Sequence, residues 1–216
     1  NEIEKKKFDN YITLLIIGII VGGRIGYVLI YNLDYYIKNL IEVFFIWEGG
    51  MSFHGGVVGI IIVTYLFSQK DKKKTFKILD LVSLAAPIGI FLGRIANFIN
   101  SELYGRETEL SWSVVFIKID NLPRHPSQIY EAFFEGFILF ILLNFIFIKS
   151  RSIPGKISGY FLIFYSIFRF LIEFTREPDI QIGLLLYQLT LGQLISIITL
   201  ILGLAIIITR NEKEFT

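Results

Sequence analysis

Cysteine is absent from the 216 residues, and histidine occurs only twice. The absence of cysteine excludes disulfides, thiolate metal sites and a cysteine nucleophile, so any thiol in a reaction has to come from a substrate. Aspartate is nearly missing from the apolar stretches, where Asp80 stands alone, and this argues against the paired aspartates of an intramembrane protease. The net charge is only +2, and the basic residues form no surface of the kind that binds DNA or RNA.

Apolar side chains are present in excess: 54% of the residues are hydrophobic and the mean hydropathy is +0.62. A water-soluble domain of this size cannot bury that much apolar surface, so the lipid bilayer is the expected solvent. A spanning helix needs about 20 mostly apolar residues. Six helices are predicted, at 11–31, 55–68, 77–98, 128–148, 157–175 and 187–209. The expected fold is an all-α polytopic membrane protein, with residues 1–216 as a single integral membrane domain.

The second predicted helix, 55–68, is short for a span. About 14 residues rise only about 21 Å, which is less than the hydrocarbon core of about 30 Å. We expect the apolar segment 41–47 to extend this helix or to pack against it as a re-entrant arm.

Lysine and arginine are distributed unequally between the two sides of the predicted spans. With the N-terminus inside, 13 of the 21 fall on the inner side and 5 on the outer side. The positive-inside rule therefore predicts that both ends of the chain are cytoplasmic. The loops 32–54, 99–127 and 176–186 would then face outward, and we expect function there. The loop 99–127 would form a small head or arm, with a short strand or hairpin at 110–120.

A polar stripe is predicted at the end of the third helix. Arg94 and Asn97 are three residues apart and Ser101 follows four later, so all three share one helical face before Gly105 ends the helix. The planar fork of an arginine suits a lipid phosphate. Alternatively, Arg94 reaches the membrane interface or pairs with Glu102.

Arg169 and Glu173 form a second charged pair inside an apolar stretch. Their i,i+4 spacing allows them to pair along one helix or to point together into a polar cavity. If Arg94 and Arg169 lie at similar depth on separate helices, they would form a two-sided clamp for an anion.

His54 lies among four glycines in segment 47–56. Glycine allows the backbone to approach a ligand closely, and an imidazole can exchange a proton near neutral pH. The alternative is a tight turn at the membrane edge with a hydrogen-bonded histidine.

Two further polar segments favour structural roles. In segment 124–136, Ser127 is a candidate helix cap. Its neighbours are expected to line an entrance or to pack, namely His125, Gln128, Tyr130 and Glu131. In segment 21–32, three glycines, Gly22, Gly23 and Gly26, favour close helix packing. Arg24 would reach the interface, pair with an acid or help to hold a headgroup.

Five segments together resemble the signature segments of the prolipoprotein diacylglyceryl transferases, in the same order. They are GGRIGYVLIYN at 22–32, WEGGMSFHGG at 47–56, GRIANFINSELYGR at 93–106, HPSQIYE at 125–131 and FRFLIEFTREPD at 168–179. The resemblance implies an enzyme of the bacterial inner membrane whose active site faces outward. It would transfer the sn-1,2-diacylglyceryl group of phosphatidylglycerol to the lipobox cysteine of a prelipoprotein signal peptide, giving a thioether and glycerol phosphate. It implies no metal and no organic cofactor.

The resemblance assigns site residues only where the motifs match. These are His54 in the second segment, Arg94, Asn97, Glu102 and Gly105 in the third, and Arg169 and Glu173 in the fifth. Ala96 and Ser101 stand where the family usually has glycine. The family usually has seven membrane helices, the first with an Arg-Trp-Tyr-Gly stretch and a functional tyrosine, and we expect this sequence to lack that helix.

The implied reaction needs a thiolate and a stabilised leaving phosphate. His54 is the expected base for a thiol with a pKa of about 8.5, and Arg94 and Arg169 are expected to stabilise the phosphate. An arginine-bound phosphate oxygen or the substrate headgroup is the alternative proton acceptor. Asn97 would orient phosphate oxygens, while Glu102 and Glu173 would hold the arginines. A transporter, a channel or a purely structural subunit are the competing classes of protein.

Overall fold

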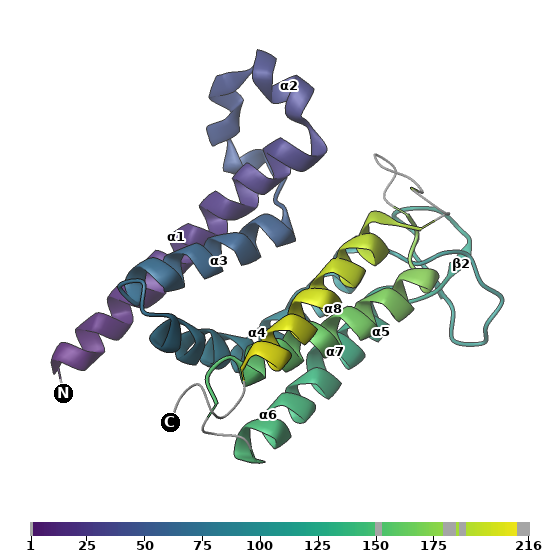
Figure 1. Cartoon of the computed structure of the whole chain (residues 1–216). Coiled ribbons are helices and arrows are strands. Elements are labelled where there is room, and N and C mark those ends of the chain that lie inside the picture. Colours follow the sequence, from purple (N-terminus) through teal and green to yellow (C-terminus); the bar gives the residue numbers. More distant parts are fainter. Residues whose placement is uncertain (1, 150–152, 179–184, 186–188, 211–216) are drawn as a thin grey trace. The chain divides into compact units, whose positions relative to one another are not determined.

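The computed structural model describes residues 2–149, 153–178, 185 and 189–210 and is mostly helical (Figure 1). It divides into two compact units, residues 1–79 and residues 80–216.

Five helices in the described part of the chain are long and apolar enough to cross a membrane. Four are α1 (Glu2–Tyr31), α4 (Lys72–Asn100), α7 (Lys156–Ile172) and α8 (Leu191–Thr209). The fifth runs from Ser127 to Lys149 as α5 (Ser127–Glu131), the π-helical segment η3 (Ala132–Ile138) and α6 (Leu139–Lys149). The prediction of an all-α polytopic membrane protein is confirmed. Most of the predicted loop 176–186 and the start of the last predicted helix lie outside the described residues.

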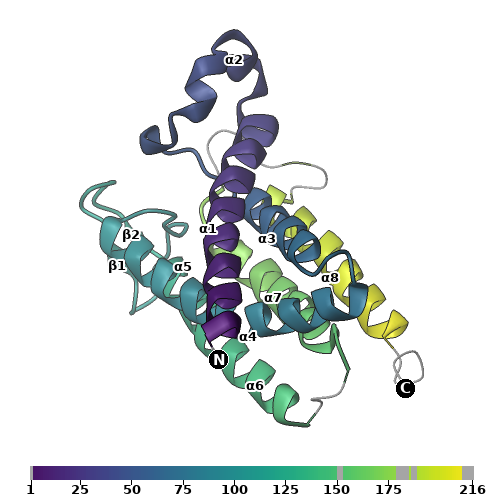
Figure 2. The same cartoon turned by 90° about the vertical axis from the view of Figure 1, so that its left-hand side faces the viewer.

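The second predicted helix is α3 (Phe53–Phe67), which has 15 residues and rises about 22 Å. The apolar segment before it does not lengthen it, because Gly49 and Gly50 turn the chain with φ of 85° and 76°. This segment instead lies in η1 (Leu40–Phe44) and η2 (Ile46–Glu48), which form an arm together with α2 (Leu33–Lys38). Figure 2 shows the arm beyond the end of α1. The expectation that it would extend α3 is therefore wrong.

Helices α1 and α3 of the first unit touch through glycines. A Cβ on Gly22 would lie 2.4 Å from the carbonyl oxygen of Gly55, and one on Gly26 would lie 2.7 Å from the Cα of Gly55. Gly23 faces a side chain instead, with its Cβ position 2.8 Å from the Cε of Met51. The predicted role in helix packing is confirmed for Gly22 and Gly26, because larger residues there would push the two helices apart.

Arg24 is 4% exposed and ties the arm to α1. Its guanidinium donates hydrogen bonds to four backbone carbonyls, those of Glu42 (2.6 Å), Val43 (2.8 Å), Gly49 (2.6 Å) and Gly50 (3.2 Å). Backbone carbonyls thus satisfy the donors of an arginine that the sequence predicts at a membrane interface or near a headgroup.

In the second unit, α7 packs along α8. A Cβ on Gly203 would lie 2.9 Å from the carbonyl oxygen of Gly159, and the hydroxyls of Ser166 and Thr199 are 2.6 Å apart. At the start of α7, Asp80 accepts hydrogen bonds from the Gly155 and Ser158 backbone amides at 2.7 and 2.8 Å. The aspartate that the sequence singles out in an apolar stretch therefore stabilises a helix N-terminus.

The head between α4 and α5 contains a small antiparallel hairpin. Strand β1 (Val114–Val115) pairs with β2 (Pro123–Arg124), as the pattern at 110–120 predicts. Arg124 holds the hairpin, because its guanidinium pairs with Asp120 at 2.6 Å and lies 5.0 Å from the centre of the Tyr104 ring. In Figure 1 the head lies at the end of α5.

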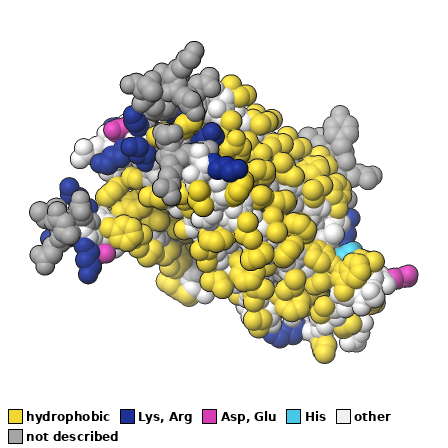
Figure 3. Space-filling model, turned by 90° about the horizontal axis from the view of Figure 1, so that it is seen from below, with side chains coloured by type: hydrophobic (Ala, Val, Ile, Leu, Met, Phe, Trp, Pro, Cys, Tyr) yellow, Lys and Arg dark blue, Asp and Glu magenta, His cyan; other side chains and the backbone are white. Residues whose placement is uncertain are grey.

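Hydrophobic side chains cover much of the surface in Figure 3. On α8 alone, Ile198 is 57% exposed, Ile201 60% and Ile208 71%. Such a surface is costly in water and favourable in lipid. The structure therefore agrees with a multi-pass membrane protein.

Candidate functional site

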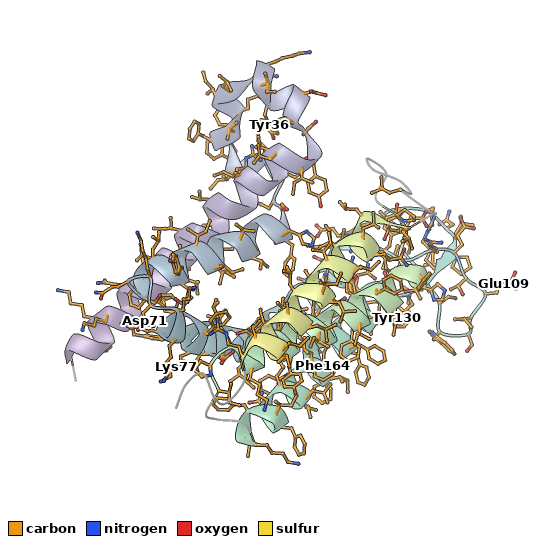
Figure 4. The ribbon with its side chains drawn as sticks, viewed as in Figure 1. Tyr36, Asp71, Lys77, Glu109, Tyr130 and Phe164 are labelled. Atoms are coloured by element: carbon orange, nitrogen blue, oxygen red, sulfur yellow. The ribbon has the colours of Figure 1, made fainter. Side chains whose placement is uncertain are left out.

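A cluster of ionisable side chains is buried in the second unit. It contains three arginines and three glutamates, namely Arg94 on α4, Glu131 at the end of α5, Glu135 in η3, Arg169 on α7, Glu173 in η4 (Glu173–Thr175) and Arg176. Figure 4 labels Tyr130 and Phe164 on the two spans that carry most of these residues. Because charges inside an apolar span are costly, a cluster of six requires mutual pairing or a function.

The two glutamates Glu131 and Glu135 each bridge the same two arginines. Glu131 places Oε2 3.2 Å from Nε of Arg94 and accepts a hydrogen bond from Arg169 through Oε1. Glu135 places Oε2 3.6 Å from Nη2 of Arg94 and Oε1 3.7 Å from Nη1 of Arg169. Both glutamates have 0% exposure. Arg94 and Arg169 are therefore brought together from two helices, but around carboxylates that the chain itself supplies.

The local backbone explains how these groups meet. The π-helical segment η3 widens the helical turn between Glu131 and Glu135. Next to Glu135, a Cβ on Gly136 would lie 2.9 Å from the Cα of Phe91 on α4. Glycine thus allows α4 to approach η3 closely, and Arg94 follows Phe91 by about one helical turn.

Glu173 holds Arg169 from the other side. Its Oε2 lies 2.6 Å from Nη2 of Arg169, so the predicted i,i+4 pair is confirmed. Its Oε1 accepts a hydrogen bond of 2.9 Å from the hydroxyl of Thr190. The Arg169 guanidinium is therefore fixed between carboxylates from two spans.

Gly105 and Arg176 join the head to the cluster. They pair as an isolated antiparallel bridge, and Nη1 of Arg176 lies 3.5 Å from Oε1 of Glu131. A Cβ on Gly105 would lie 2.3 Å from the carbonyl oxygen of His125. Gly105 thus serves close backbone packing. The expectation that it ends the helix is wrong, because α4 already ends at Asn100.

The predicted contact between Glu102 and Arg94 is also wrong. Ser101 and Leu103 have φ of 63° and 53° and turn the chain away from α4, so Glu102 is exposed. With its amide oriented to suit its neighbours, Asn97 donates to Oε2 of Glu102 at 3.3 Å. Glu131 and Glu135 hold Arg94 instead. The positive φ of Ser101 is a conformation that glycine adopts without steric cost.

Most polar residues of segment 124–136 have structural contacts. The hydroxyl of Tyr130 accepts a hydrogen bond of 2.7 Å from the Trp112 indole. Gln128 donates to the carbonyl of Glu102 at 2.6 Å. Burial lowers the pKa of His125. Ser127 is not a side-chain cap, because its hydroxyl donates to the carbonyl of Leu103 at 3.1 Å.

His54 lies in the first turn of α3, in the first unit. Ser52 caps this helix by accepting a hydrogen bond of 3.3 Å from the Gly55 amide. The half-buried His54 ring meets the Phe53 ring edge-on, with centroids 5.7 Å apart. Gly55 is in contact with Gly22 and Gly26 of α1, so this glycine serves helix packing. Arg94 and Arg169 belong to the second unit.

Sequence reasoning missed three members of the cluster. It treated Glu131 as an entrance or packing residue and did not single out Glu135 or Arg176. A signal was available, because Glu131 and Glu135 are two acids four residues apart within an apolar stretch. No group of three or more metal-binding side chains was found among the described residues.

Comparison with known proteins gives the family. The sequence profile of the prolipoprotein diacylglyceryl transferases matches residues 1–209. The chain belongs to this family. A protein of Rickettsia typhi named phosphatidylglycerol–prolipoprotein diacylglyceryl transferase is 54% identical over 214 residues, which are 98% of this chain and 83% of that protein. Proteins of the same name from Rickettsia felis and Rickettsia bellii are 51% and 49% identical, over 98% and 100% of this chain and 83% and 82% of their own lengths.

The predicted resemblance is thus confirmed over nearly the whole chain. The protein is a transferase of a family that acts in the first step of lipoprotein maturation. Within this membrane transferase, the ionisable cluster joins the third and fifth signature segments, 93–106 and 168–179, through the two glutamates of the span between them.

Proposed function

We propose that the chain transfers the sn-1,2-diacylglyceryl group of phosphatidylglycerol to the thiol of the lipobox cysteine in a prelipoprotein signal peptide. The products are a thioether and glycerol phosphate. The observation that carries this proposal is the family match over residues 1–209, together with relatives whose printed names give phosphatidylglycerol and prolipoprotein as substrates.

Arg94 and Arg169 bind the lipid phosphate in this proposal. Their side chains keep 16% and 11% exposure, while the glutamates between them have none. The hydrogen bonds of the described residues do not include Nη1 of Arg94 or Nε of Arg169, so each guanidinium has an N–H group that can donate to a phosphate oxygen. Asn97, one turn beyond Arg94, orients phosphate oxygens.

The glutamates hold the guanidiniums in position before the lipid arrives. Glu131 and Glu135 fix the separation of the two arginines, and Glu173 fixes the rotation of Arg169. Preorganised positive charge in a water-poor site stabilises developing negative charge without reorganisation. Other residues act on the shape of this site. Gly105 does so through its backbone contacts, and Glu102 does so through Asn97.

The substitution forms a carbon–sulfur bond and breaks the carbon–oxygen bond to phosphate. His54 takes the thiol proton, which leaves a thiolate to attack the glycerol carbon. The bonding electrons of the carbon–oxygen bond leave with the phosphate, whose new charge the arginines stabilise. The proton finally leaves with glycerol phosphate. No cofactor takes part in these steps.

We place the protein in the bacterial inner membrane, with both ends of this chain in the cytoplasm and the cluster toward the outer side. The support is the distribution of lysine and arginine, 13 inside and 5 outside. Substrate thiols of exported prelipoproteins would meet the site from that side.

The direct test is an assay of the purified protein in vesicles that contain phosphatidylglycerol, with a lipobox peptide as acceptor. Mass spectrometry measures the thioether product. Arg94→Ala is compared with Lys149→Ala, because Lys149 is also a cation on a span, and among the described residues its ammonium lies 4.1 Å from the centre of the Phe145 ring and outside the arginine cluster. We expect product from the wild type and from Lys149→Ala, and a loss of at least about 100-fold in Arg94→Ala.

Folded wild-type protein that forms no thioether would overturn the proposed reaction. Product that is equal in Arg94→Ala and Lys149→Ala would keep the reaction and overturn the phosphate role of Arg94. His54→Asn tests the base separately. Near-normal turnover in this variant would mean that the phosphate or the headgroup, and not His54, accepts the thiol proton.

A further inference from the structure

The start of α8 makes a contact that the proposed mechanism does not use. Thr190 and Gln193 form a reciprocal cap. The Thr190 hydroxyl accepts a hydrogen bond of 3.2 Å from the backbone N–H of Gln193, and Oε1 of Gln193 accepts one of 3.0 Å from the backbone N–H of Thr190. Thr190 is 4% exposed and Gln193 2% exposed. The cap is therefore buried and its groups are satisfied.

The Thr190 hydroxyl has one proton, and it donates this proton to Oε1 of Glu173 at 2.9 Å. The hydroxyl oxygen of Thr190 therefore caps the start of α8 and also orients the Glu173 carboxylate. Gly192 makes room for that carboxylate, since a Cβ at this position would lie 2.7 Å from Oε1 and 2.8 Å from Cδ of Glu173. The carboxylate thus lies directly against the first turn of α8.

This arrangement fixes the direction of the Glu173 side chain. Helix α8 has 19 residues, and the partial positive charge at a helix N-terminus favours a carboxylate ion. With Oε1 held by Thr190, Oε2 is directed toward Nη2 of Arg169 at 2.6 Å. A rotation of Glu173 would remove its contact with Nη2 of Arg169, so the start of α8 orients this side of the guanidinium through the carboxylate.

We propose that Thr190 and Gly192 are positioning residues for Arg169, acting through Glu173. The inference rests on the proposed function, because it assumes that Arg169 stabilises the leaving phosphate. Loss of the hydroxyl leaves Arg169 charged but less well oriented. Turnover should therefore fall more than the apparent affinity for phosphatidylglycerol.

The test compares four variants in the thioether assay. Thr190→Val keeps the shape but removes the hydroxyl, and kcat should fall about 10- to 100-fold with little change in KM. Thr190→Ser restores the hydroxyl and should recover most of the activity. Gly192→Ala should reduce kcat, because its methyl group displaces the Glu173 carboxylate. Gln193→Leu weakens the cap but keeps the Thr190 contact with Glu173, so it should lower thermal stability and leave kcat near that of the wild type.

A double-mutant cycle with Glu173→Gln separates positioning from general destabilisation. If Thr190 acts through Glu173, adding Thr190→Val to Glu173→Gln should cause no further loss. Wild-type kcat in Thr190→Val, or equal losses in Thr190→Val and Gln193→Leu, would overturn the inference. Additive losses in the double variant would do the same. If the wild type itself forms no thioether, the proposed function fails rather than this inference.

Discussion

The two units satisfy buried arginines in different ways. In the first unit, Arg24 donates to four backbone carbonyls of the arm. In the second unit, Arg94 and Arg169 pair with the carboxylates of Glu131 and Glu135. Carbonyls satisfy hydrogen bonds but leave the positive charge in place, and they fix a loop to a helix. Carboxylates offset the cost of burying the charge and orient the guanidiniums, and they leave an N–H group of each arginine for a phosphate oxygen. We therefore expect a structural role for Arg24 and a role in the reaction for Arg94 and Arg169.

Replacing each kind of arginine gives the largest expected difference. Arg169→Lys keeps a positive charge but loses the planar fork that contacts Glu131 and Glu173 at once, so turnover should fall about 100- to 1000-fold. Arg24→Lys removes most of the four contacts to the arm and should reduce turnover less than 10-fold, while proteolysis within residues 40–50 becomes faster. Turnover and proteolysis rates are measured on the same preparations. A greater activity loss in Arg24→Lys than in Arg169→Lys would reverse the comparison.

The next effect concerns the two bridging glutamates. Glu131 contacts three arginines, whereas Glu135 has the longer distances of 3.6 and 3.7 Å to two. Breaking a buried ion pair leaves an uncompensated charge and costs about 3–5 kcal/mol. Glu131→Gln should therefore lower the thermal midpoint more than Glu135→Gln does, as followed by circular dichroism in detergent. An equal or reversed order would show that the shorter contacts do not dominate the stability of the cluster.

Sequence reasoning located the helices because apolar length and basic loops depend on local composition. It also found the Arg169–Glu173 pair, which lies within one helical turn. It failed where the partner comes from another span or where the backbone turns unexpectedly. Glu102 is near Arg94 in the sequence, but the positive φ of Ser101 and Leu103 turns it away.

The remaining site contacts depend on tertiary structure. Glu135 reaches Arg94 because Gly136 allows α4 to come close, and the contact of Glu173 with Thr190 joins residues 17 positions apart. Periodicity contains no information on such pairs. Every acidic residue in one apolar stretch can be considered as a partner for every arginine in another apolar stretch. This rule would have made Glu131 and Glu135 candidate partners of the buried arginines.

Helix packing in the first unit gives a smaller but specific effect. A Cβ on Gly59 would lie 2.0 Å from the carbonyl oxygen of Gly18, whereas no atom within 4 Å meets a Cβ on Gly89 in α4. Gly59→Ala should therefore destabilise the protein by about 1–3 kcal/mol through overpacking. Gly89→Ala, the matched control, should be neutral or slightly stabilising, since alanine favours helix. Thermal unfolding in detergent measures both variants, and equal midpoints would contradict the close contact of α1 with α3.

The smallest effect is expected in the head, where the ion pair between Arg124 and Asp120 is only partly buried. The hydrogen bond from Arg124 holds the pKa of Asp120 below its usual range. A carboxylate with a lowered pKa stabilises the folded form above its ordinary pKa of about 3.9, and this contribution is lost as the pH falls through the lowered value. Between pH 7 and pH 5 the hairpin should therefore be unaffected, and it should open more often only at lower pH.

Hydrogen exchange at the Leu122 amide reports this opening, because that amide donates to the Asp120 carboxylate at 3.1 Å. Asp120→Asn should increase the opening a few-fold at pH 7 and remove the acid-induced change, and raised salt should weaken the wild-type pair. Turnover at pH 7 should remain close to that of the wild type, since Arg124 contacts the backbone of Gly105 as well. A large loss of turnover would mean that the head is coupled to the arginine cluster through Gly105 and Arg176. Structural and catalytic roles would then both be found within the second unit, and the contrast between the two units would no longer hold.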